Sequence, residues 1–588
     1  MLPGLAPSLL LTPPFQRRIP TLGRTLCGWA EIEPEPIGDD GPTSHPVVIA
    51  LHEARVGGRF WNSRSPALRS GFGVTLVCVP NDAEAAMRLW RRAVQAQEAG
   101  RLALVLPRHP RATTRFRRLL DEAGRAGAQL IPADVDPHIL LDHAVALHID
   151  AIGTLSALAL LRGLPVSRLH ASGHSIQEDP ARALALLLSA TRYTDPFSGN
   201  SMTAEAAIAL LADWHRIMLA NRGIAACVGM SLWKQRRISQ LFARADTTGS
   251  PPFHRRAHGA VRAAEEQHGS IAVWSTRVPA GLVAQAAAAG VPLARVEDGF
   301  IRSLGLGSDL LPPASVIVDK TGVYFDPSGP SDLEALLAMH SFDDRIRHRA
   351  GMLIDRLVAA NISKYAVGGS APALDAPPGR RIVLVPGQVA DDLSVRLGGG
   401  AIKDNLALLQ QVRTTAPDAF IVYRPHPDVV AGHRPGALAD ATILRFADRI
   451  SRGGAMAPLI GSVDEVHTLT SLAGFEALLR GRQVFTYGQP FYAGWGLTQD
   501  RGPIPRRNRL LTIEELVAAT LILYPRYIDP RTRLPCGPEV LIDRLADTDL
   551  WRPTILMRLR RLQGRTRRRM QAMRARSAGG KIHGAADA

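Results

Sequence analysis

Side chains able to take part in catalysis stand just after apolar stretches in the second half of this chain. Glu297 and Asp298 follow PLARV, Asp392 follows IVLVPGQVAD, His426 follows FIVYRP and Ser471 follows VHTLT. Short apolar runs of this kind are typical of buried strands in α/β sheets. Open α/β sheets bind ligands at the carboxyl ends of their strands, so the sequence predicts one site built from these side chains.

Two groups of carboxylates supply the candidate catalytic chemistry. Glu297 and Asp298 suit a general acid or base, with a turn aspartate before glycine as the alternative. Gln388 and Asp392 lie in GQVADDLS, where a carboxylate with a nearby amide and hydroxyl suits a glycosyl nucleophile and its supports. A solvated acidic loop is the alternative there. Metal binding by Asp391 and Asp392 has no DxD-type context, and we predict no metal.

Nucleotide recognition is predicted from a second group of residues. Arg424 and His426 flank a proline that fixes the backbone, and they suit a nucleotide phosphate. Ser471 is a good N-cap for a short helix that ends at Gly481, and the free amides of such a helix start attract an anion. Glu476, about one turn into this helix, is placed to reach ribose hydroxyls. The alternatives are a structural histidine and an ordinary βαβ crossover with a capping serine.

Charged and aromatic residues next to these motifs suit the rest of a ligand. Arg302 and Ser303 follow the first carboxylate pair and are predicted to hold an anionic substrate. Tyr492 and Trp495, with glycines around them, suit a base or sugar pocket. The alternative for the two aromatic residues is packing under a loop.

The elements that position these groups alternate between apolar runs and amphipathic stretches, which predicts an α/β fold. The 588 residues exceed one hydrophobic core. Two Rossmann-like halves joined by a linker are the layout of GT-B glycosyltransferases, although a fold by itself does not establish chemistry. The predicted segments are an irregular leader at 1–44, a half-module at 45–219, a Rossmann-like domain at 220–345, a helix and linker at 346–380, a nucleotide-binding domain at 381–550 and a basic tail at 551–588.

A decayed internal repeat relates the first part of the chain to the last. ALLRGLPV at 159–166 matches ALLRGRQV at 477–484, and RYTDP at 192–196 matches RYIDP at 526–530. The matches keep their order, so we interpret 45–219 as a truncated copy of the C-terminal Rossmann-like half. It lacks the stretch GQPFYAGWGLTQDRG and carries Leu158 where the second copy has Glu476. The half-module is therefore predicted to be catalytically inactive.

The composition indicates the cellular compartment and the kinds of binding partner. Four cysteines without CxxC spacing favour a reducing compartment. We predict no signal peptide and no transmembrane span, and we therefore expect a cytoplasmic protein. The net charge is +17. The tail after Pro553 alternates apolar side chains with arginines and is predicted to lie on an anionic membrane surface, a solvated tail being the alternative. Nucleic-acid binding is not predicted. The arginines assigned to the membrane are Arg558, Arg560, Arg561, Arg567, Arg568 and Arg569.

Several long motifs, in one order over 223–550, resemble the KpsC family of capsule polysaccharide proteins. They are EDGFIRSLGLGSDL, DKTGVYFDPSGPSDLE, VPGQVADDLS, YRPHPD, VHTLTSLAGFEALLRG, YGQPFYAGWGLT and LYPRYIDP. The resemblance implies a GT-B fold and a retaining β-Kdo transferase, where Kdo is keto-deoxy-octulosonic acid. The donor would be CMP-Kdo, and the acceptor a Kdo-bearing, phosphatidylglycerol-type lipid at the inner membrane. The capsule export machinery would be a further partner.

The resemblance also implies roles for individual residues. Asp392 would be the nucleophile supported by Gln388, and Asp298 with Glu297 would be the acid/base pair. His426 and Ser471 would bind the CMP phosphate, and Glu476 would bind the ribose. Arg424 and Thr470, which neighbour them in the sequence, are predicted to belong to the same nucleotide-sugar-binding group. No cofactor is implied. A scaffold that binds CMP-sugar or glycolipid without catalysis, and a transferase for another CMP-sugar, are the rival functions.

Overall fold

The computed structural model describes most of the chain: residues 5–15, 21–38, 40–62, 73–96, 101–108, 113–170, 172–244, 249–303, 311–363, 367–431 and 434–551. The predicted basic tail, with its six assigned arginines, lies outside the described residues from 552 onward. The chain folds into two compact units. Unit 1 comprises residues 1–222 with 243–250, and unit 2 comprises residues 223–242 with 251–588.

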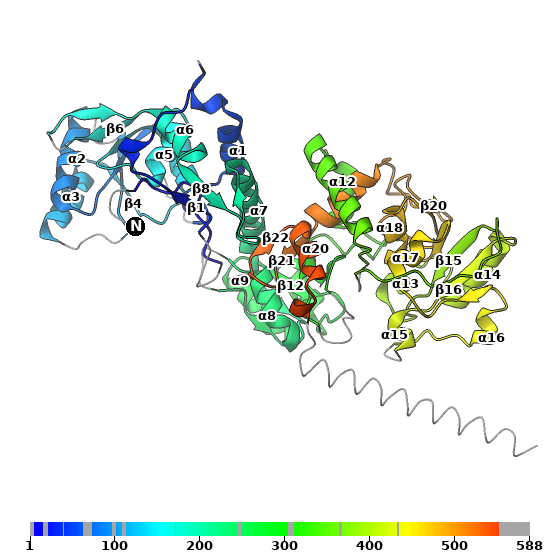
Figure 1. The fold of residues 1–588 in the computed structure, drawn as a ribbon. Coiled ribbons are helices and arrows are strands. Elements are labelled where there is room, and N and C mark those ends of the chain that lie inside the picture. Colours follow the sequence, from blue (N-terminus) through cyan, green and yellow to red (C-terminus); the bar gives the residue numbers. More distant parts are fainter. Residues whose placement is uncertain are drawn as a thin grey trace, which may run out of the picture. The chain divides into compact units, whose positions relative to one another are not determined.

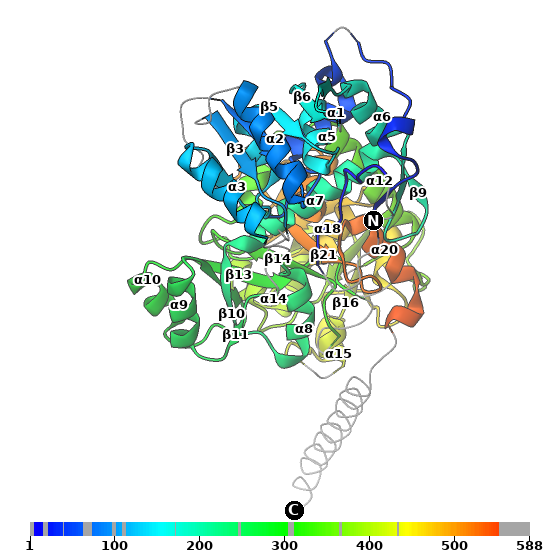
Figure 2. The ribbon, with the colours of Figure 1, turned by 90° about the vertical axis from the view of Figure 1, so that its left-hand side faces the viewer.

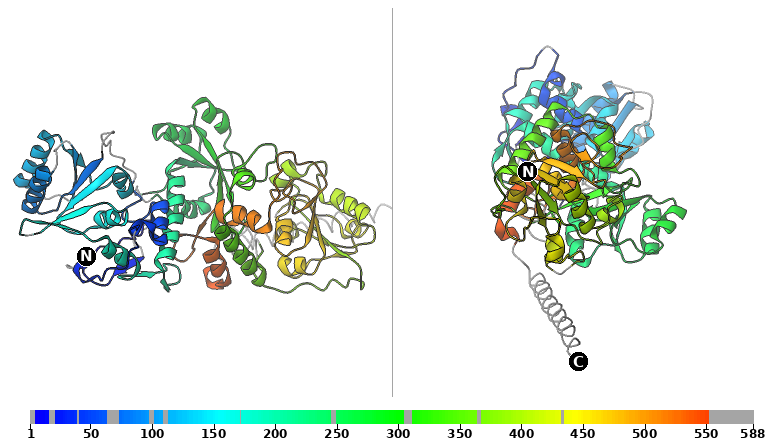
Figure 3. Two further views of the ribbon diagram at one scale, coloured as in Figure 1. Left: turned by 90° about the horizontal axis from the view of Figure 1, so that it is seen from above. Right: turned by 90° about the vertical axis from the view of Figure 1, so that its right-hand side faces the viewer.

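Unit 1 contains a six-stranded sheet whose strands are parallel except at one edge. Across the sheet the strands are β4 (Gln129–Ile131), β3 (Leu102–Val105), β2 (Val74–Cys78), β5 (Ala144–Ile149), β6 (Val166–Leu169) and the antiparallel β7 (Ser175–Gln177). The helices α2 (Ala83–Ala96) and α3 (Thr114–Arg125) pack apolar side chains against β2 and β3. Both helices are coloured blue in Figure 3. This half-module is therefore an α/β layer, as the sequence predicts.

A second, antiparallel sheet completes the strands of unit 1. It consists of β1 (Gly23–Thr25), β8 (Thr191–Thr194) and β9 (Ser201–Met202). The other helices of the unit are η1 (Trp29–Glu31), η2 (Pro42–Ser44), α1 (Pro46–Ala54), α4 (Pro137–His143), α5 (Thr154–Leu161), α6 (Pro180–Leu188) and α7 (Ala204–Arg222).

Unit 2 begins with a seven-stranded mixed sheet. Its order is β11 (Phe253–His254), β10 (Ile224–Val228), β12 (Ser270–Trp274), β13 (Leu293–Asp298), β14 (Ser315–Asp319), β21 (Pro525–Ile528) and β22 (Pro535–Cys536). The first four strands are parallel and the last three antiparallel. β21 and β22 come from the segment predicted as part of the 381–550 domain. That prediction is wrong for these strands, because the chain returns and pairs β21 with β14.

The side chains of this sheet alternate between two helical layers, as the two-residue period of a strand requires. Ala272 and Trp274 of β12 face α8 (Leu232–Leu241), whereas Ile271 and Val273 face α9 (Ala257–Glu266) and α10 (Leu282–Ala288). Figure 2 shows α9 and α10 on one side of these strands and α8 on the other. The carboxyl ends of β10, β12 and β13 are thereby held at one edge of the sheet.

The second sheet of unit 2 has six strands, all parallel. Their order is β17 (Arg449–Ile450), β16 (Phe420–Arg424), β15 (Ile382–Pro386), β18 (Glu465–Thr468), β19 (Gln483–Thr486) and β20 (Gln499–Asp500). Figure 1 shows α14 (Asn405–Thr415) on one side of the sheet and α17 (Met456–Gly461) with α18 (Leu472–Leu478) on the other. The predicted α/β fold with parallel sheets is confirmed.

The remaining helices of unit 2 connect and flank the sheets. They are α11 (Asp332–Met339), α12 (Asp344–Ala359), α13 (Leu393–Gly398), α15 (Pro427–Val430), α16 (Asp440–Ile443), α19 (Ile513–Val517), the π-helix η5 (Ala518–Leu523), α20 (Pro538–Ala546) and η6 (Thr548–Trp551). In the described part of the chain, none of the helices combines the length and hydrophobicity needed to span a bilayer.

Candidate active site

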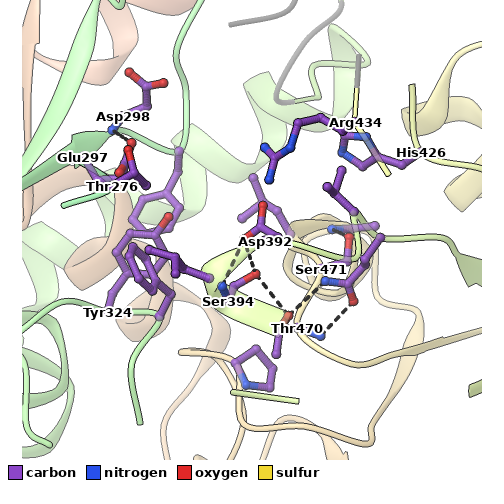
Figure 4. A pocket seen from close by; sticks show the side chains of 18 of the residues that line it. Thr276, Glu297, Asp298, Tyr324, Asp392, Ser394, His426, Arg434, Thr470 and Ser471 are labelled. Atoms are coloured by element: carbon purple, nitrogen blue, oxygen red, sulfur yellow. Dashed lines mark hydrogen bonds between the residues drawn. The ribbon is translucent and has the colours of Figure 1, made fainter. Parts of the chain in front are cut away.

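A pocket of about 740 Å3 in unit 2 is lined by residues that follow strands of both sheets. Figure 4 shows Glu297 and Asp298 on one side of it, and Asp392, Ser394, His426 and Ser471 on the other. Nine of the residues predicted from the sequence line this pocket: Glu297, Asp298, Gln388, Asp392, Arg424, His426, Thr470, Ser471 and Glu476. Groups scattered over the second half of the chain thus face one cavity.

Asp392 stands between the loop after β15 and α13, whose N-cap it is. Its Oδ1 accepts hydrogen bonds from the amide and the hydroxyl of Ser394, at 3.0 and 2.9 Å. The Ser394 hydroxyl in turn accepts one from the Thr470 hydroxyl at 3.2 Å. These bonds fix the carboxylate at the pocket wall, with one oxygen as the anchored atom.

Gln388 joins the loop after β15 to the loop after β18. Its side-chain amide donates to the Thr470 hydroxyl at 2.9 Å, and its carbonyl oxygen accepts from the Thr470 amide at 3.0 Å. Asn405 holds the backbone of Gln388 through two hydrogen bonds of 2.8 Å. A chain of hydrogen bonds therefore runs from Gln388 through Thr470 and Ser394 to the Asp392 carboxylate.

The opposite wall carries a carboxylate with a cation on each oxygen. Asp298 Oδ1 lies 3.1 Å from Lys234 Nζ, and its Oδ2 lies 2.9 Å from Arg302 Nε. Two cations at these distances stabilise the anionic form of Asp298. The side chain of Glu297 lies against the same strand end, where its Oε1 accepts a hydrogen bond of 3.0 Å from the Asp298 amide.

Arg302 does not lie where the sequence analysis predicts. Its side chain is 1% exposed, donates to the Ser303 hydroxyl and the Leu311 carbonyl, and is not one of the described residues that line the pocket. Its charge acts on Asp298 rather than on a ligand, because the guanidinium is enclosed beneath the strand end. Arg302 is therefore a support for Asp298.

Lys234, on α8, is a site residue that the motif analysis missed. Its Nζ lies 3.4 Å from the centroid of the Trp274 ring, and the side chain is buried in the pocket wall. Burial lowers the pKa of Lys234, while the carboxylates of Asp298 and Glu297 act in the opposite direction. No local pattern marks Lys234, because its partner Asp298 lies 64 residues away in the sequence.

The predicted nucleotide-binding residues surround the helix starts of the second sheet. Ser471 caps α18 through the Ala473 amide at 3.2 Å, as predicted, although α18 ends at Leu478 and Gly481 turns with a φ of 66°. His426 Nδ1 accepts the Asp428 amide at 3.1 Å, which places the proton of the neutral ring on Nε2. The imidazole thus presents an N–H donor from its other edge. Glu476 is buried and lines the same cavity.

Arg424 lines the pocket, but its guanidinium is bound to the neighbouring backbone. It donates to the Ser451 carbonyl at 3.3 Å, the Ser451 hydroxyl at 3.2 Å and the Gly454 carbonyl at 2.8 Å, and it also contacts the Gly453 carbonyl. These bonds shape the 451–454 loop. The predicted phosphate contact therefore competes with carbonyl acceptors already in place.

The predicted aromatic residues are packing residues, which was the alternative left open. Tyr492 and Trp495 are both fully buried and are not among the described lining residues. The Tyr492 hydroxyl donates to the Ser471 carbonyl at 2.5 Å, so it braces the helix start. Aromatic side chains at the wall come instead from Phe300, Tyr324 and Phe491, whose rings contact one another.

In unit 2, two α/β layers with parallel strands and one pocket lined by both have the layout of GT-B glycosyltransferases. Residues 269–527 match the family model described as capsule polysaccharide biosynthesis protein. The chain belongs to this family, as the sequence motifs predict.

Relatives with known names agree with this family. The chain is 44% identical over 358 residues to the capsule polysaccharide modification protein LipA of Neisseria meningitidis serogroup A, covering 60% of this chain and 50% of LipA. It thus spans about half the length of that relative. Among solved structures, the β-Kdo 2,7 transferase of Thermosulfurimonas dismutans KpsC is 34% identical over 55% of this chain and 99% of that chain, with a TM-score of 0.45. The corresponding β-Kdo 2,4 transferase is 31% identical over 55% and 98%, with a TM-score of 0.47.

Proposed function

We propose that unit 2 is a retaining β-Kdo transferase that moves Kdo from CMP-Kdo to a lipid-linked Kdo acceptor. The observation that carries this proposal is the single pocket with Asp392 on one wall and Glu297 with Asp298 on the other. The names of the relatives, which include a capsule modification protein and two β-Kdo transferases, support the same substrate class.

Retention at the anomeric carbon needs two displacements, and the pocket has a group for each. The Asp392 carboxylate attacks the anomeric carbon, the bond to the CMP phosphate breaks, and CMP leaves with the electron pair. The acceptor hydroxyl then gives its proton to the Glu297 and Asp298 pair and attacks the same carbon. The bond to Asp392 breaks, which restores the carboxylate and yields the glycosidic product.

The wall that carries Asp392 also holds the proposed donor contacts. The Nε2–H edge of His426 and the hydroxyl of Ser471 are assigned to the CMP phosphate, and Glu476 to the ribose hydroxyls. Gln388 and Thr470 act indirectly, because their hydrogen bonds position Ser394 and hence Asp392. Arg424 is assigned to shaping the 451–454 loop under the phosphate.

The test uses purified full-length protein, CMP-Kdo and a synthetic Kdo-lipid acceptor, with CMP release and product formation as readouts. Asp392→Ala should abolish turnover and keep CMP binding, whereas His426→Ala should weaken CMP binding. Asp440→Asn is a matched control, since Asp440 is exposed and outside the pocket. Wild-type protein that binds CMP but never releases it from CMP-Kdo would favour a non-catalytic scaffold, and the reverse pattern in the two variants would refute the assigned roles.

We also propose that unit 1 is a truncated, inactive copy of the C-terminal half of unit 2. Both six-stranded sheets follow one order, with β2 to β7 in the places of β15 to β20. The pairing of β1, β8 and β9 repeats that of β14, β21 and β22. The Tyr193 hydroxyl donates to the carbonyl six residues earlier, and the Tyr527 hydroxyl does the same. Titration calorimetry should measure a binding stoichiometry of one CMP per chain. A stoichiometry of two would contradict the proposal that unit 1 is an inactive copy.

The basic tail is proposed to bring the enzyme to the anionic inner face of the membrane, where the lipid acceptor lies. This proposal rests on its sequence pattern of arginines and apolar side chains. Deleting the residues after Pro553 should release the protein from liposomes rich in phosphatidylglycerol, as measured by sedimentation. Unchanged sedimentation of the truncated protein would contradict a membrane role.

A further inference from the structure

Arg434 is a pocket residue to which no role has been given so far. Its guanidinium donates through Nε and an Nη to the same oxygen of Asp391, at 3.0 and 2.7 Å. Arg434 and Asp391 both line the pocket, and Figure 4 shows Arg434 on the same wall as Asp392 and His426. An arginine side chain therefore stands beside the proposed nucleophile, paired with the residue that precedes it.

The backbone fixes Arg434 next to the nucleophile loop. The Arg434 amide donates to the Asp428 carbonyl at 3.3 Å, and the Ala390 amide donates to the Pro435 carbonyl at 3.2 Å. Asn405 bonds both the Gln388 carbonyl, at 2.8 Å, and the Gly436 carbonyl, at 3.5 Å. The segment that carries Arg434 and the loop that carries Asp391 and Asp392 are thus joined on both sides.

The present ion pair leaves Arg434 ready to change partner. The side chains of Arg434 and Asp391 are 38% and 54% exposed, and ion pairs at such exposure contribute little stability. Both N–H groups of Arg434 donate to one oxygen of Asp391, so the pair does not have the bidentate geometry in which arginine binds both oxygens of a carboxylate. Arg424, by contrast, has its donors on the carbonyls of the 451–454 loop.

The proposed donor creates a need for such a cation. In a 2-keto sugar acid the carboxylate is bonded directly to the anomeric carbon, which is the carbon that the Asp392 carboxylate must approach. Two anions brought this close repel each other unless a cation lies between or beside them. The cation must therefore lie near Asp392. Arg434 lies on that wall, and its planar guanidinium carries N–H groups arranged to bind both oxygens of a carboxylate.

We propose that Arg434 binds the carboxylate of the sugar acid on the donor, and that Asp391 is the resting partner which the substrate displaces. This assignment rests on the proposed function of the pocket and adds the residue that selects an acidic sugar. When the donor binds, the guanidinium leaves one oxygen of Asp391 and takes both oxygens of the substrate carboxylate. A neutral sugar on the same nucleotide offers no replacement for Asp391.

The test separates contact with the carboxylate from contact with the phosphate. In the full-length Arg434→Met variant the KM for CMP-Kdo should rise about 10- to 100-fold, as expected for losing hydrogen bonds between charged groups. Its Kd for CMP, which has the phosphate but no sugar acid, should stay within about threefold of wild type. Arg434→Lys should recover only part of the loss, and Asp391→Asn should lower the KM, because the donor no longer displaces a carboxylate.

Arg452→Met is the matched control, since Arg452 also pairs with an exposed aspartate, Asp440, and lies outside the pocket lining. It should leave both constants unchanged. An equal loss of CMP and CMP-Kdo binding in Arg434→Met would place the guanidinium on the phosphate and overturn the assignment, as would an unchanged KM. Wild-type protein that neither binds CMP nor turns over CMP-Kdo would instead refute the proposed function.

Discussion

Lys234 offers the sharpest test of the wall opposite the nucleophile. Lys234→Met keeps an apolar stem on the Trp274 ring but removes the ammonium that lies 3.1 Å from Asp298. Breaking a buried ion pair by removing one partner costs about 3–5 kcal/mol. Asp298 keeps Arg302 and its side chain is 21% exposed, so we expect a loss of only about 1–3 kcal/mol in the free energy of unfolding.

A double-mutant cycle isolates the pair. Asp298→Asn leaves the Lys234 charge buried with a weaker partner, and the double variant Lys234→Met with Asp298→Asn removes both charges. The double variant should be less destabilised than the sum of the single variants by at least about 1 kcal/mol. The midpoint of denaturant unfolding of unit 2 measures this, and the slope of the transition shows whether the unfolded states are comparable.

Kinetics give a second readout. Turnover should fall about 10- to 100-fold in Lys234→Met, because Asp298 loses one of the two cations that fix it. The Kd for CMP should stay unchanged, because the proposed CMP contacts lie on the other wall. Stability losses that add within about 0.5 kcal/mol would show that the pair is not coupled. Additive stability together with unchanged turnover would refute the reasoning for this wall.

Three further predictions follow from buried contacts. Thr470→Val removes the hydroxyl between Gln388 and Ser394, so turnover should fall more than tenfold with a stability loss of about 1–2 kcal/mol; unchanged turnover would contradict the positioning chain. Gly474→Ala puts a methyl group 2.3 Å from the Tyr492 hydroxyl, and unfolding should become easier by about 1–3 kcal/mol, measured by thermal denaturation; an unchanged melting temperature would contradict close packing there. In unit 1, burial and Arg162 lower the pKa of His138 to about 3, burial lowers that of His52 to about 4, and burial raises that of Asp136 to about 6. Below about pH 6.5 the two histidines take up protons in the unfolded chain but not in the folded chain, so the free energy of unfolding falls as the pH falls; Asp136, which binds its proton more tightly in the folded chain, acts in the opposite direction. The net loss should reach up to about 1.4 kcal/mol per pH unit. A free energy of unfolding that stays constant between about pH 6.5 and 4 would contradict this.

The strands and helices that carry the motifs were predictable because their signals are local. Apolar runs marked β13, β15, β16 and β18, and the capping serine marked the start of α18. The pairing of β21 with β14 was not predictable, because it joins residues about two hundred positions apart and no local pattern reports it. The return of the chain to the first sheet is a tertiary property.

The site was predictable as a set of residues but not as a set of contacts. Residue type indicated that Arg302, Arg424 and Lys234 carry charge, yet the fold decides what each charge meets. Arg302 is enclosed beneath Asp298, and Arg424 is bound by loop carbonyls. Lys234 reaches the pocket from a helix that carries no motif. Arg302 pairs with Asp298 only four residues earlier, whereas Arg424 and Lys234 meet groups at least 27 residues away, and in each case the fold rather than the residue type sets the partner.

The proposed copy in unit 1 lacks one part of the machinery that unit 2 has. Unit 1 repeats the strand order of the layer that carries Asp392, and its short sheet repeats only β14, β21 and β22. In the described part of unit 1, no strands correspond to β10, β12 and β13; in unit 2, β13 ends with Glu297 and Asp298, and the helix α8 that follows β10 carries Lys234. On the proposed mechanism this wall takes the proton of the acceptor hydroxyl, and the described part of unit 1 has no counterpart of it. The missing layer is therefore a reason, independent of the donor-binding side chains, for the proposal that unit 1 is inactive.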